Sequence, residues 1–541
     1  MEALRSLEIG IRAVRTQRQA LHVIGHNIAN VNTPGFSRQR AILATTLPQG
    51  SMGTGVKVEK VERLRDEVVD FYIREENPTL SRWKAKLEIL EELEILFNEP
   101  SDNSIGKIMN DFWDSWSDLA NNPESGAARA NVKEQGEALC EAFRSLYQNL
   151  RNLQTKIDEE IKTEVDHLNS IIGQIAHLNE EIEKVELGGR AQANDLRDKR
   201  DLLLDELSQL INFKYQEMRD NTLRVSVYGQ LLVSKGTVSP FLAEAGENGF
   251  LDVKWRDSGE KVVITNGKLK GLIEIRDNII PAFLEQLDAL ASTLIDEVNA
   301  IHSQGMGLDG TNQIRGWKDF TGTLDTNGSF GINGVNIQVA AGDDLDAIIA
   351  KINAEVANTG VEATKDGNKL ILRPYSSNPQ TVRITADPDN IMLGSLGILS
   401  NFFKGEGAED IAVDDAIKED LSKIAASSNG APGDNSNALS IFALKDRLVM
   451  DDGTSTFSDY YGKIIADLGV ETKQTSGLKD NQKTLLDQLE NRRQSICGVS
   501  LDEEATNIIL FQQAYRAAVY FLQIVNSLLD ILGKAMIGSQ L

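Results

Sequence analysis

Few side chains in this sequence have the types and spacing that support chemistry. His22 and His26 lie four residues apart, so on a helix both imidazoles could reach one metal ion. However, the sequence has only five histidines, no His-Glu-x-x-His motif and no evident third ligand, which favours a polar helix face over a zinc site. We therefore predict no metal site.

A glycine-rich segment, Gly305–Gly310, has the G-x-G-x-x-G spacing of dinucleotide-binding loops. Such a loop must follow a strand and precede a helix, whereas this segment follows a predicted helix, so we interpret it as a loop that closes that helix. Neither the phosphate-binding motif G-x-x-x-x-G-K-S/T nor the nucleophile motif G-x-S-x-G occurs, and no pair of carboxylates can be assigned. The sequence therefore predicts no cofactor and no enzyme.

Composition and charge exclude several classes of protein. The 541 residues carry 56 Lys and Arg against 81 Asp and Glu, which argues against a nucleic-acid partner. The two cysteines, Cys140 and Cys497, exclude a disulfide scaffold, although the sequence does not tell whether they pair. No uninterrupted apolar run approaches the length of a membrane span, and Met1–Gly10 does not resemble a cleavable signal. We predict no membrane insertion and no general secretory route.

Both ends of the chain are predicted to be amphipathic helices. In the first, apolar residues recur every three or four positions until a turn at Asn32, Thr33, Pro34 and Gly35 ends it. The last, at about 502–534, carries two adjacent apolar stripes, which are too wide for one partner helix. Such ends are marginal alone, which predicts an assembly interface of a polymer subunit. The predicted interface residues are Leu4, Leu7, Ile11, Val14, Leu21, Ile24, Ile28, Phe511, Tyr515, Ala518, Phe521, Leu522, Val525, Leu528 and Leu532.

The fold class predicted is mainly α, elongated and multidomain, with long helices, a coiled coil or bundle of the two termini, and β-rich and α+β domains inserted on the outside. Apolar spacing predicts the helices 80–100, 129–187, 193–211 and 277–303. The second of these would be about 90 Å long and would stop at Gly188 and Gly189.

Strands are predicted where the apolar period changes to two. They include 223–227 and 262–264 in the segment 213–276, and 331–339, 361–364, 369–373 and 382–385 in an insertion that also holds a helix at 343–356. The predicted domains are 1–35 with 505–541 as an inner polymerisation domain, 36–212 with 277–315 and 401–504 as a long-helix domain, 213–276 as a β-rich segment, and 316–400 as an α+β insertion.

One motif carries a family resemblance. The segment His26–Arg38 (HNIANVNTPGFSR) resembles the N-terminal motif of the bacterial flagellar axial proteins, which comprise rod, hook and hook-associated proteins. Four further stretches are similar to the hook-associated members of that family, namely 100–123, 193–211, 270–310 and 498–526. The insertion resembles the flagellin-type insertion motif at 331–335, 341–345 and 352–353.

The resemblance implies a structural adaptor that joins the flagellar hook to the filament. It implies a protein that polymerises with itself as a ring through its terminal helices, and that contacts the hook protein and the next hook-associated protein towards the filament. It further implies type III export to the extracellular flagellum at the hook–filament junction. Before export, the protein would be transiently cytoplasmic, with a chaperone bound to its C-terminal helix.

Three alternatives remain open at this point. The first is another flagellar axial protein, such as the hook or distal rod protein, against which 498–526 and the long helix 129–187 argue. The second is an enzyme carried in the insertion 316–400, which contains no histidine or cysteine. The third is a cytoplasmic coiled-coil scaffold, which would not explain why the Asn-Thr-Pro-Gly turn occurs together with apolar stripes on both terminal helices.

Overall fold

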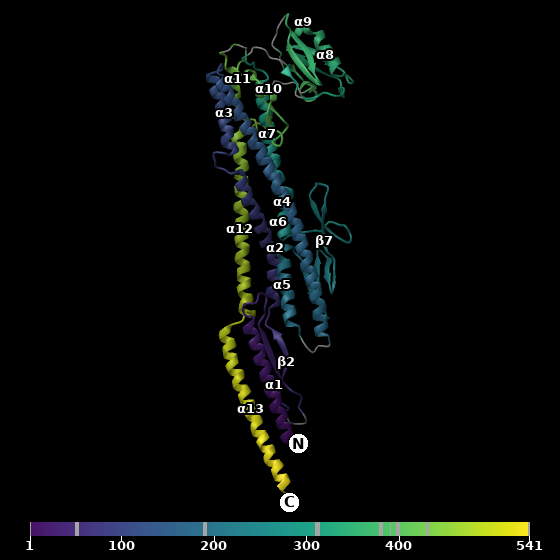
Figure 1. Cartoon of the computed structure of the whole chain (residues 1–541), viewed down its shortest axis with the longest axis vertical. Coiled ribbons are helices and arrows are strands. Elements are labelled where there is room, and N and C mark those ends of the chain that lie inside the picture. The colour runs from purple at the N-terminus through teal and green to yellow at the C-terminus, as the bar shows by residue number, and fades with distance from the viewer. Residues whose placement is uncertain are drawn as a thin grey trace. The chain divides into compact units, whose positions relative to one another are not determined.

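The computed structural model describes most of the chain, and Figure 1 shows long helices with small sheets attached to them. The described residues are 2–48, 53–187, 192–308, 314–316, 318–377, 382, 384–389, 391–396, 401–428, 431 and 433–538. The helices are α1 (Glu2–Ala29), α2 (Glu67–Phe97), α3 (Ile105–Asn121), α4 (Gly126–Glu186), α5 (Asn194–Leu210), α6 (Lys268–Glu274), α7 (Ile280–His302), α8 (Leu345–Ala354), α9 (Val356–Thr359), α10 (Asp415–Glu419), α11 (Ser436–Phe442), α12 (Phe457–Cys497) and α13 (Leu501–Gly538).

The sheets of the described chain are small, and every strand pairing in them is antiparallel. Their orders are β1-β2, β3-β4-β5-β6, β7-β8, β11-β10-β14, β12-β13-β9 and β15-β16. The strands are β1 (Gln39–Thr45), β2 (Val56–Arg63), β3 (Lys214–Glu217), β4 (Leu223–Val227), β5 (Gln230–Ser234), β6 (Thr237–Val238), β7 (Phe241–Ala245), β8 (Leu251–Trp255), β9 (Ile314–Arg315), β10 (Gly328–Ile332), β11 (Val335–Val339), β12 (Val361–Asp366), β13 (Lys369–Pro374), β14 (Ile384–Ala386), β15 (Phe403–Lys404) and β16 (Ala412–Val413).

The chain divides into two compact units, each built from segments distant in sequence. Unit 1 comprises Met1–Ile89, Thr155–Arg276 and Lys473–Leu541, and unit 2 comprises Leu90–Gln154 and Asp277–Thr472. The boundaries between the units fall inside α2, α4 and α12 and inside the π-helical turn Ile275–Ile279. The prediction of a mainly α, multidomain chain is confirmed.

Each unit has its own buried residues. In unit 1, Val69 and Ile73 of α2 pack with Leu486 of α12. In unit 2, aromatic rings of α3 stack with those of the segment around β15, with Phe112 and Phe402 at a centroid distance of 5.8 Å. Both phenylalanines are fully buried, so these rings form an aromatic core next to the short strands and helices of residues 401–457.

The insertion has a separate hydrophobic core, which also includes Ile314 of β9, just before the predicted boundary at residue 316. Its centre includes Phe330 of β10, Ile348 of α8 and Leu372 of β13, all at 0% exposure. Helix α8 begins where predicted because the Asp344 side chain accepts a hydrogen bond from the Ala347 N–H and so caps the helix.

The predicted strand 331–339 is wrong, because the segment is a hairpin of two strands. Asn333 and Gly334 both have positive φ, 49° and 83°, which is the turn that a two-residue hairpin requires. The predicted helix 343–356 also divides, into α8 and the single turn α9. The Asn-Gly pair was the signal for the hairpin, and the apolar residues on either side of it concealed the break.

Two further boundaries differ from the predictions. Helix α2 begins at Glu67, well before the predicted residue 80. Apolar spacing missed this start because Val68, Phe71 and Tyr72 are exposed, while the buried face of these turns includes the charged residues Asp70 and Arg74. The helical path predicted from 277 begins at Lys268, where α6 leads through a π-helical turn at Ile275–Ile279 into α7.

Two other predictions, a strand at 262–264 and a helix at 129–187, have different outcomes. Val262–Ile264 belongs to no strand, although the Val262 N–H donates to Val253 O at 2.8 Å and an isolated bridge joins Lys261 to Lys254. This segment therefore follows β8 without forming a ladder. The predicted helix 129–187 is confirmed as α4, and the predicted stop at Gly188 and Gly189 lies outside the described residues.

Candidate assembly interface

The two terminal helices pack against one another within unit 1. Figure 1 shows α1 and α13 running side by side. Gly10 of α1 is buried at this contact, and a Cβ atom there would lie 2.5 Å from Leu522 Cδ2 and 3.2 Å from Phe521 Cδ1. The absence of a side chain at Gly10 therefore lets the Leu522 side chain pack directly against the backbone of α1.

A two-stranded hairpin, β1-β2, covers another side of α1. The Thr16 hydroxyl donates to Val56 O at 3.1 Å, and Arg12 Nη1 donates to Thr54 O at 3.3 Å. The register of the hairpin shifts between Ile42 and Leu43. An isolated two-stranded hairpin is marginal in water, so its packing on α1 stabilises both elements.

The predicted interface residues of α1 differ in burial. Ile24 is buried, Leu7, Val14, Leu21 and Ile28 are half-buried, and Ile11 is exposed. The side chain of Leu4 lies outside the described residues. The buried face of α1 also includes small and polar residues that apolar spacing does not reveal, namely Gly10, Thr16, Ala20 and Asn27.

The predicted residues of α13 lie around the contact with α1. Val525 is buried, and Phe521 and Leu528 are exposed. The remaining predicted residues whose side chains are described are half-buried, namely Phe511, Tyr515, Ala518 and Leu522. The side chain of Leu532 lies outside the described residues. The contact with α1 thus occupies only part of the apolar surface of α13.

A second apolar seam on α13 has no partner within the described chain. Leu510, Ala517, Ile524 and Ile531 recur every seven residues, and all four are exposed. Tyr520 extends the same face and is 65% exposed. A seven-residue repeat is the pattern of a coiled-coil seam. The sequence analysis missed this seam, although the repeat itself is present in the sequence.

The apolar character of this region bears on the expectation of no membrane insertion, which stays a prediction. The stretch Phe457–Ile531, which holds α12 and most of α13, contains an 18-residue window with a mean hydropathy of 1.3, of which 6% is buried. By length and composition alone it is apolar enough to cross a membrane. The sequence prediction considered only uninterrupted apolar runs and overlooked it. The seven-residue repeat offers a different account, because an unpartnered coiled-coil seam is equally apolar.

The motif His26–Arg38 joins the two terminal helices through buried polar groups. Asn27 Nδ2 donates to Gln39 O, and the Gln39 N–H donates back to Asn27 Oδ1, both at 2.9 Å. Asn27 Nδ2 also reaches Glu504 Oε1 on the first turn of α13 at 3.3 Å. Arg38 Nε donates to the same Glu504 oxygen at 2.6 Å, and its Nη1 donates to Glu503 Oε2 at 2.5 Å.

The predicted turn is confirmed and holds the chain against α5. Asn32, Thr33 and Pro34 are exposed, and Gly35 has a φ of 76°. The positive φ favours glycine here, and a Cβ atom at Gly35 would also make a tight contact, 3.1 Å from Leu202 Cβ. Directly after the turn, the backbone N–H and hydroxyl of Ser37 donate to Asp198 at 2.9 and 2.7 Å.

Beneath this turn a buried network of arginines and aspartates connects four elements of unit 1. Asp201 of α5 accepts from Arg63 at 2.7 Å and pairs with Arg65 at 3.1 Å and Arg74 at 3.3 Å. Asp205 pairs with Arg74 and with Arg493 of α12, both at 2.7 Å. Burial alone would raise the pKa of Asp201, but the surrounding arginines outweigh it and lower that pKa.

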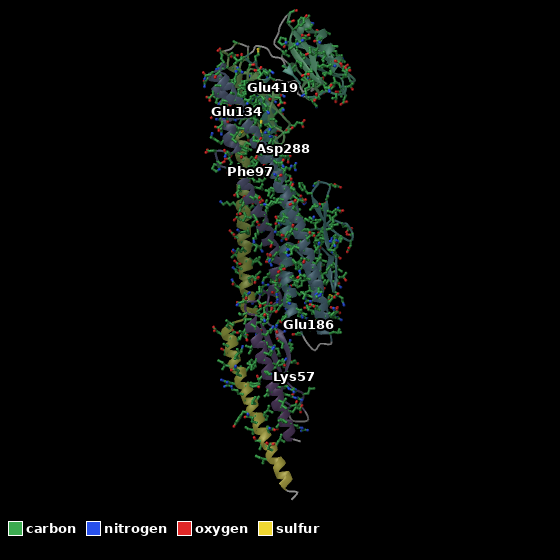
Figure 2. All side chains as sticks on the ribbon, in the orientation of Figure 1. Lys57, Phe97, Glu134, Glu186, Asp288 and Glu419 are labelled. Atoms are coloured by element: carbon green, nitrogen blue, oxygen red, sulfur yellow. The ribbon has the colours of Figure 1, made fainter. Side chains whose placement is uncertain are left out.

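A second buried carboxylate links the end of α4 to the start of α5. Glu186, labelled in Figure 2, accepts from the Ala193 N–H at 2.8 Å and pairs with Arg197 at 2.7 Å. Burial opposes the charge of Glu186, but Arg197 and the Ala193 N–H together lower its pKa. These charges hold the helices of unit 1 in place, and no reacting group lies among them.

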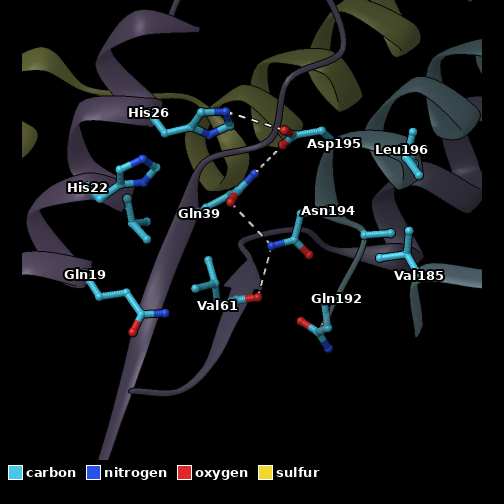
Figure 3. Close-up of a pocket in the computed structure, with 12 residues that line it drawn as sticks. Gln19, His22, His26, Gln39, Val61, Val185, Gln192, Asn194, Asp195 and Leu196 are labelled. Atoms are coloured by element: carbon cyan, nitrogen blue, oxygen red, sulfur yellow. Dashed lines mark hydrogen bonds and ion pairs between the residues drawn. The ribbon is translucent and has the colours of Figure 1, made fainter. Parts of the chain in front are cut away.

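The two histidines line a pocket of about 430 Å³ next to the same motif (Figure 3). His26 Nε2 lies 3.5 Å from Asp195 Oδ2, and Gln39 Nε2 donates to Asp195 Oδ1 at 2.8 Å. His22 lines the pocket at a separate position. Within the described ranges no group of three or more His, Cys, Asp or Glu side chains is placed to hold a metal ion.

The glycine-rich segment lies in a packed loop, and the two cysteines lie in the protein interior. Met306 and Ser427 are joined by backbone hydrogen bonds in both directions, and a Cβ atom at Gly307 would lie 2.1 Å from Ser422 O. The segment therefore follows α7 as a tightly packed loop, and its last residues, 309–310, lie outside the described chain. Cys140 and Cys497 are both buried and free.

Three family models match this chain. Residues 90–315 match the flagellar hook-associated protein FlgK helical domain, residues 320–373 match the flagellin hook IN motif, and residues 7–36 match the flagella basal body rod protein model. The first match includes α3 to α7, with the unit boundaries at 154/155 and 276/277. The second match lies in the insertion, and the third covers most of α1 and the turn.

Similarity to curated proteins extends over nearly the whole chain. The chain is 29% identical over 539 residues to flagellar hook-associated protein 1 of Bacillus subtilis (strain 168), which covers 97% of this chain and 96% of that protein. It is 27% identical over 544 residues to flagellar hook-associated protein 1 of Escherichia coli (strain K12), with 95% and 96% coverage.

A solved structure shares the fold. The flagellar hook junction protein FlgK from Burkholderia pseudomallei matches with a TM-score of 0.55 at 15% sequence identity, covering 79% of this chain and 100% of that one. At this identity the likeness concerns the fold alone.

Proposed function

We propose that this chain, a homologue of flagellar hook-associated protein 1 over nearly its whole length, is the structural adaptor that joins the bacterial flagellar hook to the filament. It polymerises as a ring through α1 and α13. The flagellar names of the relatives support a location in the extracellular flagellum and a structural rather than an enzymatic role.

The observation that carries this proposal is the unpartnered seam on α13. One side of this helix packs on α1, while Leu510, Ala517, Ile524 and Ile531 form a coiled-coil repeat that faces solvent in a single chain. A subunit with such an exposed apolar seam is stabilised when a second copy covers the seam and removes it from water. A ring supplies that second copy to every subunit.

The proposal extends to partners of the same surfaces. The hook protein and the next hook-associated protein meet the ring from its two sides. Before export through the flagellar type III apparatus, a cytoplasmic chaperone covers the exposed seam of α13, since an apolar helix face of this kind is prone to aggregation. The alternative of a hook or distal rod protein has weaker support, because the rod model matches only residues 7–36.

The test is genetic complementation read by electron microscopy. A strain that lacks the protein should carry hooks without filaments, and the wild-type chain should restore the filaments. Ile524→Asp places a charge on the proposed seam and should abolish restoration, although the variant still reaches the culture medium. Gln523→Asp adds the same charge one residue away, on an exposed position outside the repeat, and should restore filaments fully.

Two results would contradict the proposal. Filaments on hooks of the deletion strain would show that the chain is not the junction adaptor. Full restoration by Ile524→Asp, with a secreted amount equal to wild type, would show that the α13 seam is not part of the polymerising surface.

A further inference from the structure

We propose that Arg38, together with the buried side chains of Asn27 and Glu504, is an ionic lock that fixes the direction in which α13 leaves α12. The lock aligns α13 with α1 and thereby positions its free seam for a neighbouring copy. This positioning role rests on the proposed function, whereas the lock itself can be tested on the isolated chain.

The lock lies at a break between two long helices. Helix α12 ends at Cys497 and α13 begins at Leu501, so only residues 498–500 set the angle between them. The Arg38 N–H donates to Cys497 O at 2.9 Å, and Arg38 O accepts from the Leu64 N–H at 2.8 Å. The backbone of Arg38 therefore binds the last residue of α12 to the segment that follows β2.

The side chain of Arg38 spans the break. Its Nε donates to Glu504 Oε1 at 2.6 Å and its Nη1 donates to Glu503 Oε2 at 2.5 Å, both on the first turn of α13. One residue thus binds the end of α12 through its backbone and the start of α13 through its guanidinium. A short connection without this link would let α13 swing about residues 498–500.

Burial makes the contact directional. The side chain of Glu504 is 2% exposed and that of Arg38 is 17% exposed, whereas Glu503 is 61% exposed. Glu504 Oε1 accepts from Arg38 and from Asn27, which is itself fully buried and held by two hydrogen bonds to the Gln39 backbone. Any rotation of α13 about its axis would withdraw the carboxylate from both donors and leave a buried charge without a partner.

The rest of unit 1 does not depend on this contact. Helices α2, α5 and α12 are held by a separate group of charges around Asp201 and Asp205. Beyond its first turn, α13 meets α1 at the close approach of Gly10 and Leu522. Loss of the lock should therefore release α13 while the remainder of the unit stays folded.

Hydrogen exchange on the purified full-length chain tests the lock. In Arg38→Met, which leaves Glu504 buried without its cation, we expect exchange in 505–531 to become at least about a hundredfold faster, with 155–186 unchanged as an internal reference. Arg40→Met is the matched control, because Arg40 lies two residues along β1, is 60% exposed and meets Glu62 only at 3.7 Å. Its exchange should remain within about threefold of wild type.

A double variant separates an ionic lock from simple packing. Glu504→Gln added to Arg38→Met removes the stranded charge and keeps the acceptor for Asn27, so exchange in 505–531 should return most of the way to wild type. A loss caused by missing side-chain volume would not be rescued by that second change. Equal exchange in Arg38→Met and Arg40→Met, or no rescue by Glu504→Gln, would overturn the lock.

The assembly arm uses the same variants in the deletion strain. Arg38→Met should be secreted and fail to restore filaments, and the double variant should restore them in part. Filament restoration by Arg38→Met despite fast exchange would overturn the positioning role. Filaments in the deletion strain itself would instead overturn the proposed function and leave the lock to the exchange data.

Discussion

The close packing of α13 on Gly10 predicts different effects for two identical substitutions on one helix. Gly10 and Gly25 are both interior positions of α1. A Cβ atom at Gly10 would lie 2.5 Å from Leu522 Cδ2 and 2.7 Å from Leu522 Cγ, whereas a Cβ atom at Gly25 would meet nothing within 4 Å. Gly10→Ala and Gly25→Ala therefore change helix propensity equally and packing unequally.

The magnitude follows from the two contributions. Replacing glycine by alanine within a helix stabilises it by about 1 kcal/mol at either position. Overpacking a close contact costs about 1–3 kcal/mol, and only Gly10→Ala incurs it. The difference between the two variants isolates the packing cost, which corresponds to about a 5- to 150-fold difference in the local opening constant.

Hydrogen exchange of α1 amides is the suitable measurement, because the chain has two compact units and a single unfolding free energy would combine them. Exchange across α1 should slow in Gly25→Ala relative to Gly10→Ala by that factor. Leu522→Ala removes both clashing atoms, so in that background the two alanine variants should behave alike. Equal exchange of the two variants in the wild-type background would refute the packing of α1 on α13 at Gly10.

Two further predictions concern the interiors. Asp201→Asn should lower the unfolding free energy of unit 1 by about 1.5–3 kcal/mol at pH 7, because it removes the charge that three arginines share, while each arginine keeps another carboxylate, namely Asp198, Asp70 or Asp205. Hydrogen exchange in α5, with α7 of unit 2 as the reference, measures the loss. Because the folded pKa of Asp201 is lowered, its stabilisation is complete above its unfolded pKa of about 3.9 and is lost as pH falls through the folded pKa. The difference in stability between wild type and Asp201→Asn should therefore narrow below about pH 4. A stability difference that stays constant with pH would contradict the assignment. Ile348→Ala should destabilise the insertion core by about 2–5 kcal/mol, seen as faster exchange in α8 and its neighbouring strands without change in α4, and a uniform change along the chain would contradict a separate insertion core.

The long helices could be predicted because their apolar spacing and their burial coincide. Helix α4 keeps a buried residue at nearly every third or fourth position, from Val132 to Ile182, and the sequence placed its ends within a few residues. The start of α2 was missed for the opposite reason, since Val68, Phe71 and Tyr72 are apolar and exposed. Apolar spacing predicts a helix boundary only where it also reports burial.

The polar part of the site could not be predicted from local patterns. The turn at residues 32–35 was evident from its proline and glycine, but the partners of the neighbouring residues lie far along the chain. Ser37 meets Asp198 after 161 residues, and Asn27 meets Glu504 after 477. Spacing rules describe one element at a time, so they cannot give a contact that two elements make only after folding.

The location of these polar contacts bears on how a terminal helix can both dock and polymerise. Apolar contacts alone would not decide which face of α13 meets α1, because both the seam Leu510–Ile531 and the face around Val525 are apolar. Instead, a charged pair at the first turn and a glycine contact near Leu522 hold α13 by its other side. Orientation thus comes mainly from polar groups with strict geometry, which leaves the repeating apolar face available for assembly.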